Sequence, residues 1–300
     1  MRAPAHSARK LAPLSVEHAR IGRHRIRYAV RPGDPGRPPL LFLNGIGANI
    51  ELALPFIDAL TGPTVVIFDV PGVGGSPTPA SPYRPAGIAR LAAALLDHLE
   101  FTEADVLGVS WGGAIAQQFA FQHPARCRRL ILAATSPGAL MVPAQPSVLL
   151  KMVTPRRYHD KAHAHRVAGD IYGGAFRGDP DLVSATFRHV RFSSKGGYYL
   201  QLAAAWGWTS LPWLFLLRQP TLVMSGTDDP LVPPINARIL SWLIPDARLE
   251  MIDCGHLFLV TRAAESARIV ESFLTEPETD AQPRRRRAAR SPQSSSGRTS

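Results

Sequence analysis

Short apolar runs alternate with segments of helical periodicity along most of the chain. The apolar runs have the length of buried strands, and they are Pro38–Gly45, Thr64–Gly72, Asp105–Ser110, Arg129–Ser136, Pro220–Asp229 and Ala247–His256. The segments with helical spacing of apolar residues are Glu51–Leu60, Gly87–Phe101, Trp111–His123, Asn236–Leu243 and Ala263–Phe273. Fully apolar strands separated by helices are typical of a mostly parallel central sheet with helices on both faces. The pattern therefore predicts an α/β fold.

The alternation is interrupted between residues 137 and 218. This segment shows no strand–helix repeat and is rich in aromatic and basic residues. Because the alternation resumes afterwards, we expect a mainly helical cap that is inserted between two strands of one sheet. The predicted organisation is a flexible N-terminal extension at 1–20, an α/β core at 21–136 and 219–275, the cap at 137–218, and a disordered tail at 276–300.

The chain carries a formal net charge of +11, and part of this excess comes from residues 276–300. This tail has six arginines against three acidic residues, and it has almost no aliphatic side chains. Such a composition buries too little apolar surface to offset the entropy of ordering, so we expect a disordered basic tail. A basic tail can be attracted to an anionic surface. Because no aromatic residues are interleaved with the arginines, we expect no dedicated nucleic-acid partner.

The cysteine content and the length of the apolar runs indicate the cellular compartment of the protein. The two cysteines, Cys127 and Cys254, are too few for a disulfide framework and fit a reducing compartment. The first residues lack the apolar stretch of a secretory signal. No apolar run reaches the roughly 18 residues that a transmembrane helix needs. We therefore expect a cytoplasmic protein without a transmembrane segment.

The strand–helix junction at residues 108–112 has the sequence Gly-Val-Ser-Trp-Gly. A G-x-S-x-G sequence between a strand and a helix is typical of a nucleophile elbow, in which a strained turn lifts the serine hydroxyl out of the backbone. Glycine is needed two residues before and two residues after the serine, because side chains there would clash. The sequence therefore indicates Ser110 as a catalytic nucleophile at the carboxyl edge of the sheet.

A serine hydroxyl needs a general base, and that base needs an acid to orient it. In this architecture the chain order is serine, then Asp or Glu, then His. Asp228 and Asp229 follow one late strand, and His256 follows the next. The two aspartates cannot both face the histidine. We predict Asp229, which lies just before a proline after the chain has turned outward, and we expect Asp228 to cap the turn.

Acyl transfer also requires hydrogen-bond donors for the oxyanion. We expect one from the backbone N–H of Trp111, directly after the nucleophile, and one from the backbone N–H of Ile46 in a glycine-rich loop. Asn44 stands in this loop where many hydrolases carry histidine, and its side chain is a candidate substrate contact. The cap histidines His159, His163 and His165 are more typical of a solvated surface than of a metal site, so we expect neither metal nor organic cofactor.

The chain resembles the intracellular poly(3-hydroxyalkanoate) depolymerases for medium-chain-length polyesters, a group within the α/β-hydrolase superfamily. The segments that carry the resemblance are LFLNGIGANIELALPFIDAL, FDVPGVGGSPTP, VLGVSWGGAIAQQFAF, ARCRRLILAATSPGALMVP, IYGGAF, GWTS and DCGHLFLVTRA. They span residues 38–273 and leave out the first 20 residues and the basic tail. The resemblance implies a serine ester hydrolase that works on polyester storage granules and releases 3-hydroxy fatty acids or oligomers. It assigns Ser110, Asp229 and His256 to the catalytic triad.

An alkyl-substituted polyester needs an apolar cleft lined with aromatic side chains. We expect the cap to supply it through Trp206, Trp208 and Trp213, although packing within the cap is the alternative role for each of them. Other hydrolase activities remain open, namely a soluble-ester esterase, a carbon–carbon bond hydrolase and a cofactor-free perhydrolase. A non-catalytic granule-binding protein is the alternative of another class. A dehalogenase or an epoxide hydrolase is disfavoured, because those enzymes place an aspartate where Ser110 stands.

Overall fold

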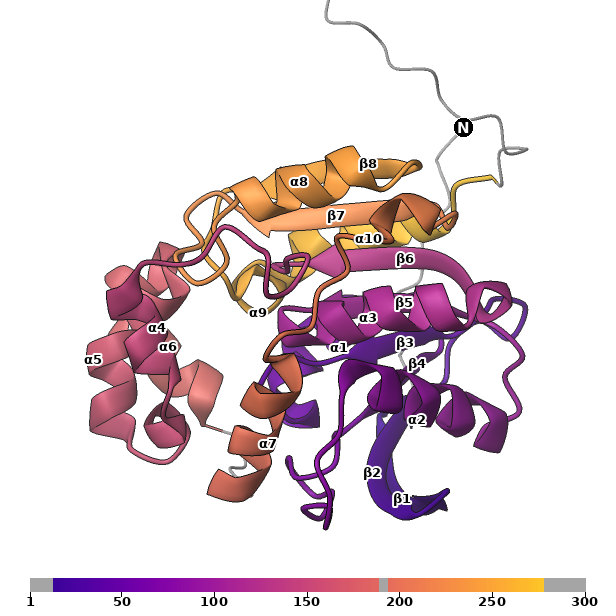
Figure 1. Cartoon of the computed structure of the whole chain (residues 1–300), viewed down its shortest axis with the longest axis horizontal. Helices are drawn as coiled ribbons and strands as arrows, with labels where there is room; N and C mark the ends of the chain where they lie inside the picture. Colours follow the sequence, from indigo (N-terminus) through magenta and orange to yellow (C-terminus); the bar gives the residue numbers. More distant parts are fainter. Residues whose placement is uncertain (1–12, 189–193, 278–300) are drawn as a thin grey trace, which may run out of the picture.

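A computed structural model describes residues 13–188 and 194–277 of the chain. Its centre is an eight-stranded sheet in the order β1-β2-β4-β3-β5-β6-β7-β8 (Figure 1). The strands are β1 (Ser15–Ile21), β2 (His24–Arg31), β3 (Leu40–Leu43), β4 (Val65–Phe68), β5 (Ala104–Val109), β6 (Cys127–Ala133), β7 (Thr221–Gly226) and β8 (Ala247–Ile252). Strands β3 to β8 run parallel, whereas β2 pairs antiparallel with both β1 and β4.

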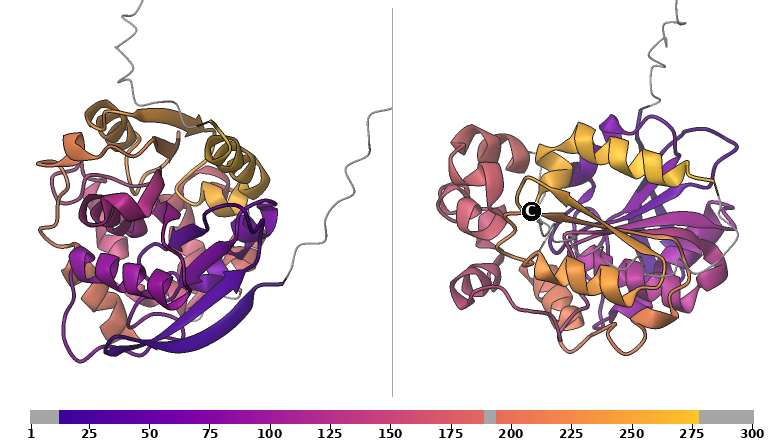
Figure 2. Two further views of the ribbon diagram at one scale, coloured as in Figure 1. Left: turned by 90° about the vertical axis from the view of Figure 1, so that its right-hand side faces the viewer. Right: turned by 90° about the horizontal axis from the view of Figure 1, so that it is seen from above.

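Helices cover both faces of this sheet (Figure 2). The core helices are α1 (Leu54–Ala59), α2 (Pro85–His98), α3 (Trp111–Gln122), α8 (Ile235–Leu243), α9 (Phe258–Thr261) and α10 (Ala263–Leu274). Leu41 and Leu43 of β3 belong to the apolar cluster that also contains side chains of α2, α3 and α8. Leu40 and Phe42 of the same strand belong to the cluster that contains side chains of α1, α9 and α10. Alternate residues thus face opposite sides, which is why this parallel strand is apolar throughout.

The cap segment, residues 137–218, follows β6 and precedes β7. Its described part contains α4 (Pro146–Met152), α5 (Lys161–Tyr172), α6 (Pro180–Phe187) and α7 (Lys195–Ala205), and it contains no strand. Helices α4, α5 and α6 gather beyond one end of the sheet, while α7 lies closer to the core (Figure 1). Apolar side chains of α5 and α6 form a small cluster of their own. The carboxyl ends of β5 and β7 point toward this cap.

The N-terminal boundary differs from the sequence-based expectation. Residues 15–20, which we assigned to a flexible extension, belong to strand β1, so the prediction is wrong for them. β1 pairs with β2 from Ser15↔Val30 to Ile21↔His24, and Gly22 adopts a positive φ of 55° in the turn. β1 is mostly exposed, so its side chains lack the apolar signal of a buried strand. Residues 1–14 of the expected extension include 1–12, which lie outside the described residues.

The other end of the chain is described as far as residue 277. The expected disordered tail therefore lies almost wholly outside the described residues, except for Glu276 and Pro277. Glu276 forms an ion pair with Arg248 of β8. Across residues 13–188 and 194–277, no helix has both the length and the apolar character required to cross a bilayer.

Candidate active site

The turn between β5 and α3 holds Ser110 in an unusual backbone conformation. Its φ of 54° and ψ of −118° are strained for a residue with a side chain. Two hydrogen bonds fix the turn from the neighbouring strand: the Ser110 N–H donates to the Ala133 carbonyl at 2.9 Å, and the Thr135 hydroxyl donates to the Ser110 carbonyl at 2.6 Å. Such outside contacts are what allows strain to persist at one residue.

Three glycines allow this turn to pack against its neighbours. A Cβ on Gly108 would overlap the backbone of Gly112, and a Cβ on Gly112 would overlap the carbonyl of Leu43 in β3. A Cβ on Gly113 would overlap the Thr135 side chain. The glycines therefore hold the start of α3 tightly against the ends of the central strands, and Ser110 lies at the carboxyl edge of the sheet.

Asp229 and His256 form a buried pair at the same edge. Their side chains are nearly inaccessible to solvent, and Asp229 Oδ2 lies 2.7 Å from His256 Nδ1. The other oxygen of Asp229 accepts the backbone N–H groups of Leu231 and Val232, at 2.9 and 2.8 Å. With its carboxylate so occupied, Asp229 favours the tautomer in which Nδ1 carries the proton and Nε2 is free to act as a base.

Asp228 has a different environment from its neighbour. Its carboxylate accepts two hydrogen bonds from the guanidinium of Arg177, both at 2.9 Å, and one from the Gly174 N–H at 2.7 Å. Arg177 is the main reason why the pKa of Asp228 is lowered below its ordinary value. The expected turn-capping role is wrong, because the acceptor groups of Asp228 are taken up by the cap. Asp228 therefore connects the sheet edge to residues 174–177.

The loop that carries His256 is also joined to the cap. The His256 N–H donates to the Tyr172 carbonyl at 2.7 Å, and the two rings are stacked with centroids 6.3 Å apart. Gly174 has a positive φ of 53°, and a Cβ there would overlap the backbone nitrogen of Gly255. A Cβ on Gly255 would in turn overlap the Tyr172 carbonyl. This close backbone contact fixes the histidine from the cap side, just as Asp229 fixes it from the sheet side.

Ser110 and His256 line one small cavity together with Asn44 and Ile46. The cavity has a volume of about 40 Å³. Pockets that hold a drug-sized ligand usually have a volume of roughly 300–1,000 Å³. The predicted nucleophile, the predicted base and the predicted oxyanion loop are thus brought to one place. In this conformation, however, the cavity is too small for a polymer segment.

The loop at residues 44–47 leaves one backbone donor available. The Gly45 N–H donates to the Asn44 side chain at 3.2 Å, and the Gly47 N–H donates to Gln201 Oε1 at 2.7 Å. Among the described residues, the Ile46 N–H has no acceptor. Trp111 is the first residue of α3, where N–H groups lack an acceptor within the helix. These are the two donors that the sequence indicated for an oxyanion.

Asn44 organises the same loop. Its side-chain nitrogen donates to the Asn49 carbonyl at 2.7 Å while its oxygen accepts the Gly45 N–H. The side chain thus bridges the two ends of the turn. Asn44 also lines the cavity, so the expected substrate contact stays a prediction, and the hydrogen bonds add a structural role that the sequence left open.

The three cap tryptophans are not brought to this cavity. Trp206 is 80% exposed. Trp208 donates from its indole nitrogen to Gln118 at 2.8 Å, and Trp213 stacks on Phe121 with ring centroids 4.5 Å apart. Gln118 and Phe121 belong to α3, so Trp208 and Trp213 pack on the core rather than around Ser110. Their hydrophobicity gave no information on which surface they would cover.

Residues of the cap that the sequence analysis missed line the cavity instead. They are Met152, Arg157, Tyr158 and Tyr172. Leu231 and Leu257, next to the acid and the base, also contribute. Tyr172 lies within the IYGGAF segment, which was an available signal. Arg157 follows Arg156, and two adjacent arginines are typical of a solvated surface. The sequence therefore offered no signal that Arg157 is buried.

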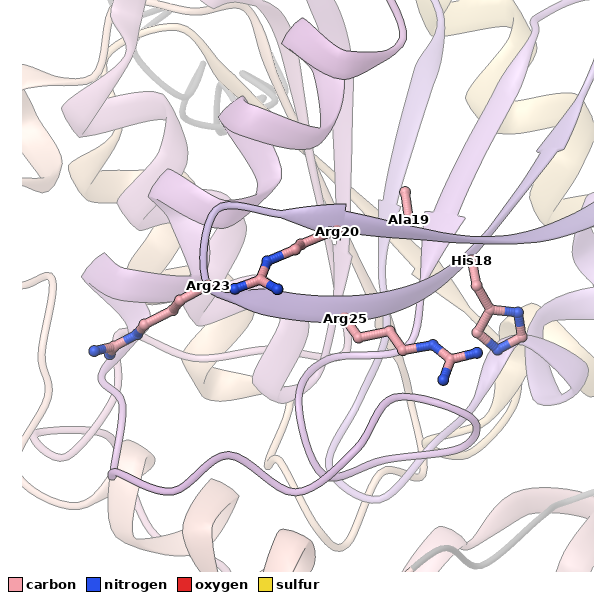
Figure 3. Close-up of a pocket in the computed structure, with 5 residues that line it drawn as sticks. All are labelled: His18, Ala19, Arg20, Arg23 and Arg25. Carbon is pink, nitrogen blue, oxygen red and sulfur yellow. The ribbon is translucent and has the colours of Figure 1, made fainter.

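A wider hollow, of about 360 Å³, lies on the β1–β2 hairpin (Figure 3). Its lining consists of His18, Ala19, Arg20, Arg23 and Arg25. The side chains in Figure 3 project from the hairpin and do not converge on one point. None of the described residues that line this hollow is a serine, a cysteine or a carboxylate, so we place the residues for acyl transfer around Ser110.

Comparisons with known proteins agree with this architecture. The family model described as alpha/beta hydrolase fold matches residues 38–263. The chain is 52% identical over 286 residues to a poly(3-hydroxyalkanoate) depolymerase of Ectopseudomonas oleovorans, with 95% of this chain and 99% of the relative covered. It is 27% identical to 3-oxoadipate enol-lactonase 2 of Acinetobacter baylyi, over 81% of this chain and 90% of the relative. Among solved structures, the enol-lactonase of Burkholderia xenovorans aligns with a TM-score of 0.75 and 25% identity, covering 87% of this chain and all of the other.

The match to the depolymerase is longer than the sequence segments suggested. We expected the first 20 residues and the basic tail to lie outside it. A match that covers 95% of the chain leaves fewer residues unmatched than the first 20 residues and the tail at 276–300 contain together. The likeness therefore extends over the complete core and cap and into at least one terminal segment.

Proposed function

From the premise that the chain belongs to the alpha/beta hydrolase fold family, we propose that it hydrolyses the ester bonds of an intracellular medium-chain-length poly(3-hydroxyalkanoate). The single observation that carries the substrate is the 52% identity to a poly(3-hydroxyalkanoate) depolymerase across core and cap together. The support for the chemistry is that Ser110 and His256 line one cavity and that His256 is paired with the buried Asp229.

The reaction starts with the transfer of the Ser110 proton to His256 while the serine oxygen attacks an ester carbonyl. The N–H groups of Ile46 and Trp111 stabilise the oxyanion that forms. His256 then gives its proton to the departing hydroxyl of the chain, which leaves an acyl-enzyme on Ser110. Water, deprotonated by the same histidine, releases the acid. Asp229 orients the imidazole and stabilises its charged form in both halves.

A cavity of about 40 Å³ cannot hold this substrate, so the site has to open before a chain enters. The sheet edge is fixed by β strands, and we therefore assign the opening to the cap. Met152 of α4 lines the cavity, and its neighbours Leu149, Leu150 and Val153 are 43%, 71% and 52% exposed. An exposed apolar surface next to a residue that lines the cavity suits an enzyme that works on a water-insoluble granule. We expect this part of the cap to meet the polyester.

The experiment is a hydrolysis assay on polyester granules of defined side-chain length, with release of 3-hydroxy acids measured against time. Medium-chain granules should be degraded, and Ser110→Ala should serve as the inactive control. Activity on soluble short esters alone would replace the proposal with a soluble-ester esterase. Cleavage of a vinylogous diketone, or peroxyacid formation from hydrogen peroxide, would identify the carbon–carbon hydrolase or the perhydrolase. Failure to react with a fluorophosphonate probe would leave a non-catalytic granule-binding protein.

We further propose that the protein is cytoplasmic and associates with storage granules, and that its basic tail contributes to this association. The tail carries six arginines, whose attraction to an anionic surface is long-ranged at low ionic strength. Truncation after Pro277 should weaken co-sedimentation with granules at low salt and have little effect at high salt. The control is activity on a soluble ester, which the truncation should leave unchanged. Equal co-sedimentation of both forms at low salt would contradict a role for the tail.

A further inference from the structure

The cavity around Ser110 contains a buried cation. Arg157 lies in a short 3-10 helix of the cap, Pro155–Tyr158, and is 2% exposed. It lines the same cavity as the nucleophile and the base. Burying a guanidinium is costly unless the charge is compensated, so the groups around Arg157 are informative.

Within the described part of the chain, all the hydrogen-bond partners of Arg157 are neutral. Its guanidinium donates to the hydroxyls of Tyr172, Tyr198 and Tyr158, at 3.0, 3.1 and 3.3 Å, and to the carbonyl of Thr154 at 3.2 Å. It also lies over the ring of Tyr158, 4.4 Å from the centroid. These contacts occupy four of the five N–H donors of the guanidinium, and none of these partners carries a negative charge.

A comparison within the same chain shows how unusual this is. Arg27 is also buried, and its guanidinium pairs with Glu51 at 2.6 Å and with Asp69 at 2.9 Å. For Arg157, no aspartate or glutamate forms an ion pair within residues 13–188 and 194–277. An anion that arrives in the cavity would therefore meet an uncompensated positive charge.

Tyr172 adds a second group of the same kind. Its hydroxyl accepts from Arg157, and its own proton has no acceptor among the described residues. The hydroxyls of Tyr158 and Tyr198 are committed to the carbonyls of Ile46 and Met152. Burial raises the pKa of Tyr172, which keeps its hydroxyl protonated and able to donate. Its ring is stacked on the ring of His256, with the centroids 6.3 Å apart. Because Arg157, Tyr172 and His256 line one cavity, an anion held by Arg157 and Tyr172 would lie in the same cavity as the base.

The chemistry of the polymer decides which anion fits. In a poly(3-hydroxyalkanoate), the part of the chain on the acyl side of any ester ends in a free hydroxyl. The part on the alcohol side, which leaves when Ser110 attacks, ends in a carboxylate. Only the leaving part can therefore carry a terminal negative charge, and when it is a single unit, its carboxylate is three bonds from the ester oxygen that His256 protonates.

We propose that Arg157 and Tyr172 form a binding site for the terminal carboxylate of the polyester chain, which favours cleavage of the last ester and release of one 3-hydroxy acid. This inference rests on the proposed function. In the step, the Ser110 oxygen–carbonyl bond forms, the ester C–O bond breaks, and the serine proton passes through His256 to the leaving oxygen. Hydrolysis of the acyl-enzyme then gives the shortened chain a new terminal carboxylate, which is the group that the same site binds next.

The test compares a medium-chain 3-hydroxy acid trimer with its methyl ester, which has no terminal charge. The wild-type enzyme should show a kcat/KM about 10- to 100-fold higher for the free acid, as a charge-assisted hydrogen bond provides. The monomeric acid should be the first product. Arg157→Gln should bring the ratio of the two kcat/KM values close to one, and Tyr172→Phe, which keeps the ring on His256, should lower it less.

Arg156→Gln is the matched control, because Arg156 is the exposed neighbour, pairs with Asp160 at 2.8 Å and does not line the cavity. It should leave the ratio unchanged. The ratio of two substrates on one protein sample also corrects for a variant that folds only in part. If Arg157→Gln yields no folded protein, the wild-type ratio and Arg157→Lys, which keeps the charge and should keep the preference for the free acid, decide the question.

The possible outcomes separate the two proposals. A wild-type ratio near one would overturn the carboxylate site and leave a depolymerase. A preference for the free acid that survives Arg157→Gln would place the anion elsewhere and overturn the role of Arg157. Cleavage of neither trimer by an enzyme that still hydrolyses a simple soluble ester would instead remove the proposed function itself.

Discussion

The two walls of the catalytic cavity are built by different means. On the sheet side, Ser110 is held by a backbone hydrogen bond to the end of β6 and by glycines that allow close packing, and Asp229 is held by backbone N–H groups of its own loop. On the cap side, Arg157 and Tyr172 are held by one another through their side chains. Backbone contacts fix reacting atoms firmly, whereas a side-chain cluster can change with the substrate. From this difference we expect the chemistry to depend on the sheet edge and the choice of substrate to depend on the cap.

The two walls are joined at one place. The His256 N–H donates to the Tyr172 carbonyl, and Gly174 packs on the Gly255 backbone. The Asp228 carboxylate accepts two hydrogen bonds from the Arg177 guanidinium. A cap that opens must keep or break these contacts. Substitutions on each wall and at the junction therefore separate loss of chemistry from loss of cap placement, and their effects should fall in the order given below.

The largest effect should come from the sheet side. Ser110→Ala removes the nucleophile, and we expect turnover of any ester to fall by roughly 10⁴-fold or more, as in serine hydrolases generally. Alanine occupies the same strained turn as serine, so the melting temperature should change little. Steady-state hydrolysis and fluorophosphonate labelling are the measurements. Near wild-type turnover in this variant would refute the assignment of the nucleophile.

Asp229→Asn should have the next largest effect. The amide keeps the shape of the side chain but no longer stabilises the charged imidazole, and it allows the wrong tautomer. We expect kcat to fall by roughly 10³-fold for soluble and polymeric esters alike, because the chemistry and not the substrate contact is altered. Parallel assays on the two substrate classes check this. If kcat fell for the polymer but not for soluble esters, Asp229 would position the cap and would not orient His256.

The sheet side was largely predictable from the sequence. A G-x-S-x-G sequence after an apolar strand restricts the backbone so strongly that the position of Ser110 follows from local steric rules. Parallel strands end at one edge, so Asp229 and His256 were expected beside it. The α/β-hydrolase fold is confirmed by the sheet and by the family match. Both strands of the N-terminal hairpin were missed, because β1 is an exposed edge strand with little apolar signal and β2 carries three arginines.

The cap side was not predictable in the same way. Its helices are placed by tertiary packing, and hydrophobicity does not say which partner an aromatic ring will meet. Trp208 and Trp213 pack on α3, whereas Tyr172 reaches the catalytic cavity. Arg156 and Arg157 are adjacent and chemically identical, yet one is exposed and the other buried. The difference arises from three tyrosines that bind the Arg157 guanidinium. Two of them are distant along the chain, and the adjacent one is not distinguishable in sequence from the other aromatic residues of the cap.

Gly174→Ala addresses the junction. The new Cβ would adopt an unfavourable positive φ and overlap the Gly255 backbone, so either the cap or the histidine loop has to move. We expect the free energy of unfolding to fall by roughly 1 to 3 kcal/mol and kcat to fall by about tenfold. Thermal unfolding and soluble-ester kinetics give both values. Gly178→Ala is the matched control, since open space surrounds that position, and it should be neutral.

The smallest effect should come from Asp228→Asn, although Asp228 is adjacent to Asp229. The variant weakens a half-exposed ion pair with Arg177, and such pairs contribute roughly 1 kcal/mol or less. We expect less than a threefold change in kcat for a soluble ester and a somewhat larger change for granules, whose binding requires the cap in place. High salt should reduce the difference from wild type, because exposed charges are screened.

The pH dependence of this last effect has a definite sign. Because the pKa of Asp228 is lowered in the folded protein, the stabilisation by Arg177 is fully present above the ordinary carboxylate pKa and is lost only as the pH falls through the lowered value. The difference between Asp228→Asn and wild type should therefore stay constant from about pH 5 to pH 8 and shrink in strong acid. Unfolding measured across this range tests it. A difference that varied between pH 5 and pH 8 would mean that Asp228 titrates there and that the junction is not held by this ion pair.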